Sequence, residues 1–242
     1  MIGVFAWLAT HQAAPPAAPR SPNTVIAQVT SVNPTVSDAI GTGSLVSPLK
    51  VVSTLPPLVD GSGKPEVLYV GAEYCPFCAG ERWSLIAALS RFGTFSGLTL
   101  TTSSSTDAFP NTATFSFKTT TYTSDVIAFV PVELQDREGK ALQSTTAEQQ
   151  ALLKKLDEGG SIPFIDFGNR FSTVGAGFKL DMLSGLDWQQ IGFQLSDANS
   201  PIARGIVGNA NYLTAALCRM TGDKPSATCS DPVIQQIARG LG

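Results

Sequence analysis

The sequence predicts an α/β protein with a central mixed β-sheet flanked by helices. Three observations predict this class. A short, β-branched apolar run at Glu66–Ala72 leads directly into a helical pattern that starts at Pro76. A capped amphipathic pattern near 145–156 is followed by two short strand patterns joined by turn residues. The remainder of the chain is helical in pattern, so helices are available to cover the sheet.

The first strand and helix are the clearest part of the pattern. Pro76 suits a first helical turn, because its missing N–H group would have no partner there anyway. The residues Arg82, Leu85, Ile86, Leu89 and Phe92 fall at helical spacing, and Gly93 is a suitable stop. A second strand at Leu98–Ser105 would then complete a β-α-β unit.

A Thr- and Phe-rich segment at about 106–132 follows, and we expect it to be a β insertion that packs beside the domain. Its aromatic residues either belong to the core or line a peptide groove, and the sequence leaves both interpretations open. These residues are Phe109, Phe115, Phe117, Tyr122 and Phe129.

The C-terminal half has recognisable helix and turn signals. Thr145 and Glu148 form the pattern of a capping box, and Leu152, Leu153 and Leu156 then share a helix face. The strand patterns "PFIDFG" and "RFSTVGAGF" flank the turn residues Gly168–Asn169. A helical extension begins at Ser200–Pro201 and ends at Gly222, and Ser230 would cap a last short helix. Between Thr24 and Pro57 the pattern is weak.

We expect three parts along the chain. Residues 1–22 read as the remnant of a membrane anchor followed by an Ala/Pro linker, because an apolar run from Met1 to Ala9 is too short to span a bilayer alone. Residues 23–60 would form an N-terminal extension that packs on the domain, and 61–242 the domain with its insertion. This organisation predicts an extracytoplasmic protein tethered to the membrane through an upstream segment. A disordered apolar tail is the alternative interpretation of Met1–Ala9.

Composition excludes several classes of function. Charged residues make up only 14% of the 242 residues, the net charge is −3, and no basic run supports nucleic-acid binding. The single histidine, His11, lies in the expected linker. A Ser-His-Asp or Cys-His catalytic arrangement and a histidine metal site therefore lack their residues.

The segment "AEYCPFC" places Cys75 and Cys78 where the predicted strand meets the predicted helix. Unpaired N–H groups and the positive end of the helix dipole favour a thiolate there. Cys75 would attack a disulfide, and Cys78, three residues later, would resolve the mixed disulfide. Half of a four-cysteine zinc site and inert packing are the alternatives.

This segment resembles the active site of the thioredoxin superfamily, in which a Cys-x-x-Cys motif follows an Ala-Glu-aromatic triplet. By the same resemblance, "GGSIPFIDFGNRF" would place a cis peptide at Ile162–Pro163 facing the cysteines. This peptide would position an extended substrate, while Tyr74 and Phe77 would shape the rim around the sulfur.

The runs "GAEYCPFCAGERWSLIAALSRFGTFSGL", "FPNTATFSF", "VIAFVPVEL" and "SIPFIDFGNRF" resemble a thioredoxin-like family known as domain of unknown function 929. The resemblance extends from about Leu45 to the C-terminus and implies a thioredoxin-like fold and a redox pair. One position departs from thioredoxin: Tyr69 stands where thioredoxin has a buried acid. This departure favours an oxidase or isomerase over a reductase. Glu73 lies nearby, and we expect it to point to solvent.

Cys218 and Cys229 flank a predicted helix end, with Gly222 and Pro225 between them. A disulfide that closes this loop would stabilise the fold by about 3 kcal/mol in the chain-entropy model. A structural disulfide of this kind is typical of oxidising compartments. A second redox pair that relays electrons is the alternative.

The sequence therefore predicts an extracytoplasmic thiol–disulfide oxidoreductase that acts on protein thiols or disulfides, with a membrane redox partner as a further expectation. It requires no cofactor and no metal. One alternative is a non-enzymatic, thioredoxin-like binding module that keeps Cys75–Cys78 as a static bridge. The other is a carrier that holds a metal through its cysteines.

Overall fold

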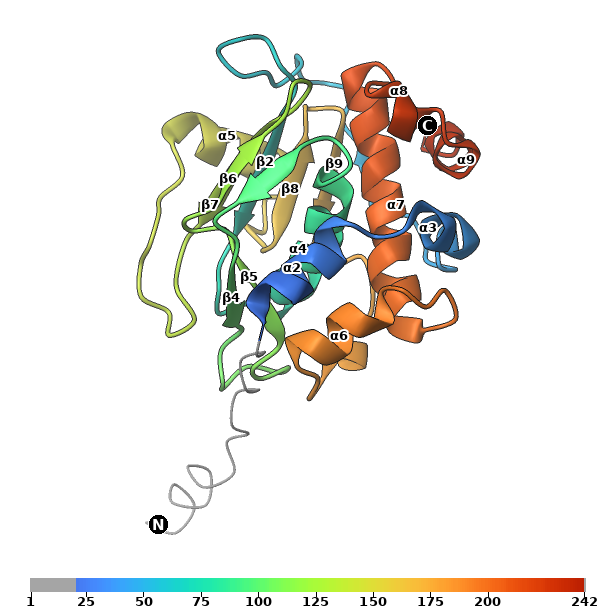
Figure 1. The fold of residues 1–242 in the computed structure, drawn as a ribbon. Helices are drawn as coiled ribbons and strands as arrows, with labels where there is room; N and C mark the ends of the chain where they lie inside the picture. Colours follow the sequence, from blue (N-terminus) through green and yellow to red (C-terminus); the bar gives the residue numbers. More distant parts are fainter. Residues whose placement is uncertain (1–20, 242) are drawn as a thin grey trace.

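The computed structural model describes residues 21–241, and a five-stranded mixed sheet lies at its centre (Figure 1). The strand order is β1-β9-β8-β2-β7, with β2 parallel to β7 and the other neighbouring pairs antiparallel. The predicted α/β class with a mixed sheet is confirmed. The strands are β1 (Lys50–Val51), β2 (Glu66–Gly71), β7 (Ala128–Glu133), β8 (Phe164–Phe167) and β9 (Phe171–Val174).

Helices cover both faces of this sheet. The helices α4 (Pro76–Leu89) and α7 (Pro201–Thr221) lie on one face, and α5 (Ala147–Leu156) lies on the other (Figure 1). Successive side chains along each strand point to opposite faces of the sheet, so they belong to two separate hydrophobic cores. Tyr69 and its neighbours on one face pack with α4 and α7, whereas Leu68 and its neighbours pack with the leucines of α5.

The parallel partner of β2 differs from the predicted one. The sequence predicts a strand at Leu98–Ser105 as the second strand of the β-α-β unit, but β4 (Thr99–Thr102) pairs with β5 (Ala113–Ser116) in a separate two-stranded sheet. The strand beside β2 is β7, which lies at the end of the expected insertion. β7 is largely apolar and forms the edge of this sheet beside β2, whereas the threonine-rich β4 lies in the separate ribbon. The last part of the 106–132 segment therefore belongs to the central sheet.

The rest of this segment forms small ribbons and contributes to the main core. A second ribbon pairs β3 (Thr94–Ser96) with β6 (Thr121–Thr123). Phe115 and Phe117 are buried, and the ring of Phe117 meets the edge of Tyr69 at a centroid distance of 5.2 Å. Phe109, Tyr122 and Phe129 are partly buried against the same core. The core interpretation therefore holds for the buried phenylalanines of this segment.

Two helices lie in the N-terminal region, where the sequence pattern between Thr24 and Pro57 is weak. The helix α2 (Pro22–Thr30) packs against α4 and α6 (Trp188–Gln194), and α3 (Pro34–Ile40) packs against α7 (Figure 1). Both helices begin with a proline in the first turn, and Asn33 caps α3 through a hydrogen bond from the Thr35 N–H group. These short-range signals are present in the sequence, but the helices are too short for a strong apolar period.

The start and end of α7 follow the prediction, whereas the starts of α5 and α9 are shifted by one residue. Ser200 caps α7, and Gly222 ends it in a left-handed conformation with φ of 65°. The capping box of α5 uses Thr146 and Gln149, not Thr145 and Glu148. Likewise Asp231, not Ser230, caps α9. The remaining helical segments are η1 (Leu180–Leu183), α6 (Trp188–Gln194), α8 (Ser226–Cys229) and α9 (Pro232–Arg239).

The predicted disulfide joins Cys218 at the end of α7 to Cys229 of α8. Both half-cystines are buried, and their Cα atoms are 5.5 Å apart. Because these two sulfurs bond to each other, they are not available to complete a four-cysteine zinc site with Cys75 and Cys78.

Between residues 21 and 241, no helix has both the length and the apolar character that a bilayer-spanning segment needs. The predicted anchor remnant and linker at 1–22 fall, apart from the last two positions, outside the described residues.

Candidate active site

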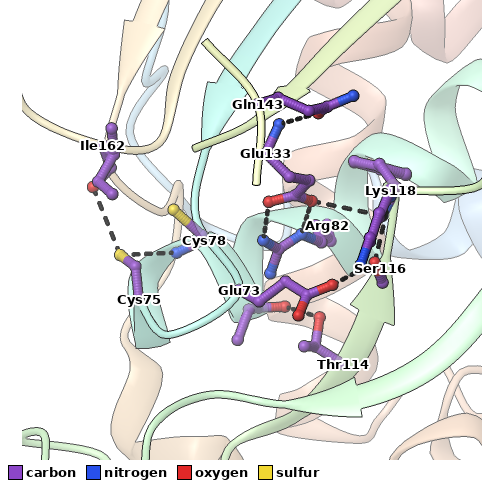
Figure 2. Close-up of polar contacts among 12 residues, drawn as sticks. Glu73, Cys75, Cys78, Arg82, Thr114, Ser116, Lys118, Glu133, Gln143 and Ile162 are labelled. Atoms are coloured by element: carbon purple, nitrogen blue, oxygen red, sulfur yellow. Dashed lines mark hydrogen bonds and ion pairs between the residues drawn. The ribbon is translucent and has the colours of Figure 1, made fainter. Parts of the chain in front are cut away.

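Cys75 lies at the junction that the sequence predicts, as the N-cap of α4. The strand β2 ends at Gly71, and Pro76 occupies the first turn of the helix. The N–H group of Cys78 donates to Cys75 Sγ at 3.4 Å (Figure 2). The sulfur therefore takes the place that a Ser or Asp oxygen usually holds at a helix N-terminus, where a negative charge is favoured.

The two sulfurs have different environments. Cys75 is 6% exposed and Cys78 is fully buried. A hydrogen bond from the Cys78 side chain, the N–H groups of Cys78 and Phe77, and the charge of Arg82 together lower the pKa of Cys75 from 9.0 to about 7, against the opposing effect of burial. Burial raises the pKa of Cys78 well above its ordinary value, and the hydrogen bond and charge of Cys75 add to this. Cys75 is therefore the more readily ionised thiol.

The peptide bond Ile162–Pro163 is cis, as the resemblance to thioredoxin implies. It immediately precedes β8, and the Cys75 thiol donates to the Ile162 carbonyl oxygen at an Sγ–O distance of 3.7 Å (Figure 2). The structure thus brings together three of the predicted site residues, Cys75, Cys78 and Ile162, although Ile162 is 87 positions away from Cys75 in the chain.

The predicted rim residues lie beside the motif. Phe77 is 44% exposed, and its ring meets the edge of Phe109 at a centroid distance of 6.1 Å. Tyr74 is partly buried, and its carbonyl oxygen accepts a hydrogen bond from the Ser104 N–H group at 2.9 Å. Tyr74 also borders an open hollow of about 430 Å³ that Asp107 and Arg137 help to line. An apolar ring and a polar hollow therefore flank the loop that carries Cys75.

A buried ion pair that the sequence does not predict lies behind the cysteines. Arg82 Nη2 donates to Glu133 Oε2 at 2.7 Å, and Arg82 Nε donates to Glu133 Oε1 at 3.0 Å (Figure 2). Both side chains are fully buried. The guanidinium carbon of Arg82 lies 5.7 Å from the centre of the Tyr69 ring. The only sequence signal is that Arg82 falls in the apolar register of its helix.

Glu73 does not point to solvent as we expected. It is 8% exposed, and its Oε1 atom accepts a hydrogen bond from the Ser116 hydroxyl group (Figure 2). The Glu73 N–H group also donates to the carbonyl oxygen of Gln135 at 2.9 Å. The ribbon that carries Ser116 folds back over the cysteine loop, and this long-range contact has no signal in the local sequence.

A second buried carboxyl group, Glu81, lies one residue before Arg82 on α4. Its Oε2 atom accepts from the Gly177 N–H group at 3.0 Å and from Asn209 Nδ2 at 2.8 Å. Burial raises the pKa of Glu81 to about 8, although these two donors oppose the shift. Glu81 therefore holds the loop after β9 to α4 and α7.

Within residues 21–241, no three His, Cys, Asp or Glu side chains gather in the way that a metal ion would require. The polar chemistry at this site consists of the two thiols, the Ile162 carbonyl oxygen, the charged pair Arg82–Glu133 and the Glu73 carboxylate.

Comparison with known proteins gives one finding. No curated protein matches this chain, and no solved structure matches it. A family model described as Domain of unknown function (DUF929) matches residues 55–159, which include Cys75, Cys78, Arg82 and Glu133 but not Ile162–Pro163. The match over residues 55–159 agrees with the resemblance of the motifs in this segment to the DUF929 family.

Proposed function

We propose that this protein is a thiol–disulfide oxidoreductase in which Cys75 is the nucleophile and Cys78 is the resolving thiol. One observation carries the proposal: Cys75 caps α4 and accepts from the Cys78 N–H group at 3.4 Å, which lowers its pKa, whereas Cys78 is fully buried, which raises its pKa. A pair divided in this way reacts in a fixed order, because only a thiolate attacks a disulfide.

The exchange balances without a cofactor. In the oxidising direction, a substrate thiolate attacks Cys75 of the Cys75–Cys78 disulfide, which forms a mixed disulfide and releases Cys78. A second substrate thiolate then displaces Cys75, so the substrate gains a disulfide and the protein keeps two thiols. In the reverse direction, Cys75 attacks the substrate disulfide and Cys78 resolves the mixed disulfide.

The surroundings of Cys75 suit an extended peptide substrate. The Ile162 carbonyl oxygen lies 3.7 Å from the sulfur, and the exposed ring of Phe77 offers an apolar contact beside it. An extended segment that binds along Ile162–Pro163 would present its cysteine to Cys75. The strand order β7-β2-β8-β9, with a cis peptide at the start of β8, supports a thioredoxin-like fold for this arrangement.

Two features favour an oxidase or isomerase that acts outside the cytosol. Tyr69 stands at the position where thioredoxin, a reductase, carries a buried acid. The structural disulfide Cys218–Cys229 suits an oxidising compartment. As part of the proposal, the domain would be tethered to a membrane that also holds its redox partner.

Two single substitutions test this function with a reduced, unfolded protein whose activity returns when its disulfides form. Cys75→Ser should abolish oxidation of this substrate. Cys78→Ser, incubated with the same substrate protein in its disulfide-bonded form, should accumulate a mixed disulfide, because Cys75 attacks the substrate disulfide, one substrate thiol is released and no second thiol resolves the bond. Non-reducing electrophoresis and mass spectrometry detect this species.

The double variant Cys218→Ala/Cys229→Ala is the matched control, because it also removes cysteines but leaves the site intact. It should retain the exchange activity. If Cys75→Ser protein oxidises the substrate as fast as the unmodified protein, or if Cys78→Ser traps nothing, the proposed function is wrong.

A further inference from the structure

The buried ion pair lies one helical turn beyond the resolving cysteine. Arg82 follows Cys78 by four positions on α4, so both side chains project from the same face of the helix (Figure 2). Glu133 ends β7, the strand beside β2, and its Oε1 atom also accepts from the Phe117 N–H group at 3.3 Å. Both carboxylate oxygens of Glu133 are thus engaged, which fixes the guanidinium in one orientation.

Two polar atoms beside this pair have no hydrogen-bond partner. They are Arg82 Nη1 and the Tyr69 hydroxyl oxygen, and both are buried. A Cβ atom on Gly71 would collide with the Tyr69 hydroxyl group, so this group lies over the end of β2 that leads to the cysteine loop. Buried donors without partners are rare in native proteins and call for a functional or structural reason.

The resolving step requires Cys78 to lose its proton, and the charged groups around Cys78 affect how readily it does so. Cys78 is fully buried, and a buried thiol resists ionisation. Of the charged and titratable groups around it, Cys75 opposes a second negative charge, the Arg82 cation favours one, and Tyr69 stays neutral because burial raises its pKa well above the ordinary value. Glu133 balances Arg82, and Glu73 is occupied with Ser116.

We propose that Arg82, oriented by Glu133 and Tyr69, is a positioning residue that stabilises the Cys78 thiolate when it attacks the mixed disulfide at Cys75. The proposal rests on the proposed function and names the groups that make its second step possible. In that step the Cys75–substrate S–S bond breaks and the Cys75–Cys78 bond forms. The departing substrate sulfur takes up the proton that Cys78 loses.

Tyr69 stands at the position where thioredoxin carries an acid, and here its ring packs against the Arg82 guanidinium group. An acid at this position would accept the thiol proton, whereas a fixed cation lowers the free energy of the thiolate itself. Glu133 is an unsuitable proton acceptor, because Arg82 and the Phe117 N–H group already occupy its oxygens. The Arg82 Nη1 atom has no hydrogen-bond partner, so it can donate to the negative charge that forms on Cys78 during the reaction.

The test follows the two thiols separately with dithiobis(nitrobenzoate), whose released thiolate absorbs visible light. Attack by Cys75 releases the first chromophore, and attack by Cys78 on the resulting mixed disulfide releases the second. Stopped-flow measurement of the second phase across pH reports the ionisation of Cys78. Loss of one nearby opposite charge shifts a thiol pKa by about 1 unit or more, which is about tenfold in rate at fixed pH.

Two substitutions should act in opposite directions. Arg82→Gln removes the cation, so the second phase should slow about tenfold at neutral pH and its midpoint should move to higher pH. Glu133→Gln leaves the cation uncompensated, so the midpoint should move to lower pH. Loosened packing alone would move both variants the same way. Arg91→Gln is the control, because Arg91 lies beyond the opposite end of α4 and bonds Ser37.

If Arg82→Gln fails to fold, Glu133→Gln and the neutral double variant Arg82→Gln/Glu133→Gln still decide the matter. The double variant should resemble Arg82→Gln in its midpoint. A midpoint that is unchanged in Glu133→Gln, or that shifts upward, overturns the proposal. Failure of the proposed function is recognised separately, because an inactive protein would leave the unfolded substrate unoxidised while both chromophore phases remain measurable.

Discussion

The buried carboxyl group of Glu81 predicts an unusual dependence of stability on pH. Its side chain is fully buried, and its pKa is raised from 4.5 to about 8 in the folded protein. The folded state therefore holds the Glu81 proton more tightly than the unfolded state does. The stability that this group contributes is complete below pH 4.5 and is lost as the pH rises to about 8.

The size of this effect follows from the two pKa values. The free energy of unfolding changes by about 1.4 kcal/mol for each pH unit between them, which gives about 5 kcal/mol over the whole interval. At pH 7 the loss is about 3 kcal/mol. Replacing Glu81 by Gln keeps an acceptor for Gly177 and Asn209 but removes the titrating proton. The Glu81→Gln variant should therefore be about 3 kcal/mol more stable than the unmodified protein at pH 7.

Urea unfolding of both proteins at several pH values from 4.5 to 8 measures this difference. The stability gap should open steadily as the pH rises. Asp166 also has a pKa raised by burial, to about 7, so the comparison must be the difference between the two proteins and not either curve alone. Glu158→Gln, at an exposed position, is the control and should follow the unmodified protein. Parallel curves for Glu81→Gln and the unmodified protein would refute the reasoning.

Three further predictions concern stability. Removing the disulfide with Cys218→Ala/Cys229→Ala should cost about 3 kcal/mol in urea unfolding, because the closed loop spans 11 positions; a loss below about 1 kcal/mol would contradict this. Gly177→Ala should lower the melting temperature by several degrees, because a Cβ atom there would collide with Asn209, and an unchanged melting temperature would show that the loop adapts. Thr146→Ala should cost about 1 kcal/mol through loss of the helix cap, whereas Thr145→Ala should cost little if the cap is assigned correctly.

The parts of the fold that depend on neighbouring residues are predictable from the sequence. Cys75 and Pro76 at the start of α4, the turn at Gly168–Asn169 and the ends of α7 at Ser200 and Gly222 all follow from local chemistry. Where two adjacent residues both fit a cap, as at the starts of α5 and α9, the sequence misplaces the helix start by one position.

Strand pairing is less predictable, because it depends on contacts that are distant in the chain. The strand at Thr99–Thr102 follows α4 directly, yet β7 is the parallel neighbour of β2. The apolar character of β7 is visible in the sequence, but its position within a Thr- and Phe-rich segment conceals its role. Pairing preferences between separated strands are weak compared with the effect of burial.

The buried charges of the site are the features that sequence reasoning misses most completely. Arg82, Glu81 and Glu133 belong to residue types that are almost always exposed, and the one local signal of their burial is that Arg82 falls in the apolar register of its helix. They become buried because α4 is enclosed by the sheet, by α7 and by the ribbons of the 106–132 segment. The prediction that Glu73 points to solvent is wrong for the same reason, because contacts from distant parts of the chain bury this side chain.

The central claim is that Cys75 is the ionised thiol of the pair and Cys78 is not. Its most direct test is the rate of alkylation by iodoacetamide at each cysteine as a function of pH, resolved by mass spectrometry. Cys75 should react with a midpoint near pH 7, and Cys78 should stay largely unmodified until well above pH 9. Equal midpoints near pH 9 for the two thiols, or faster modification of Cys78, would contradict the account.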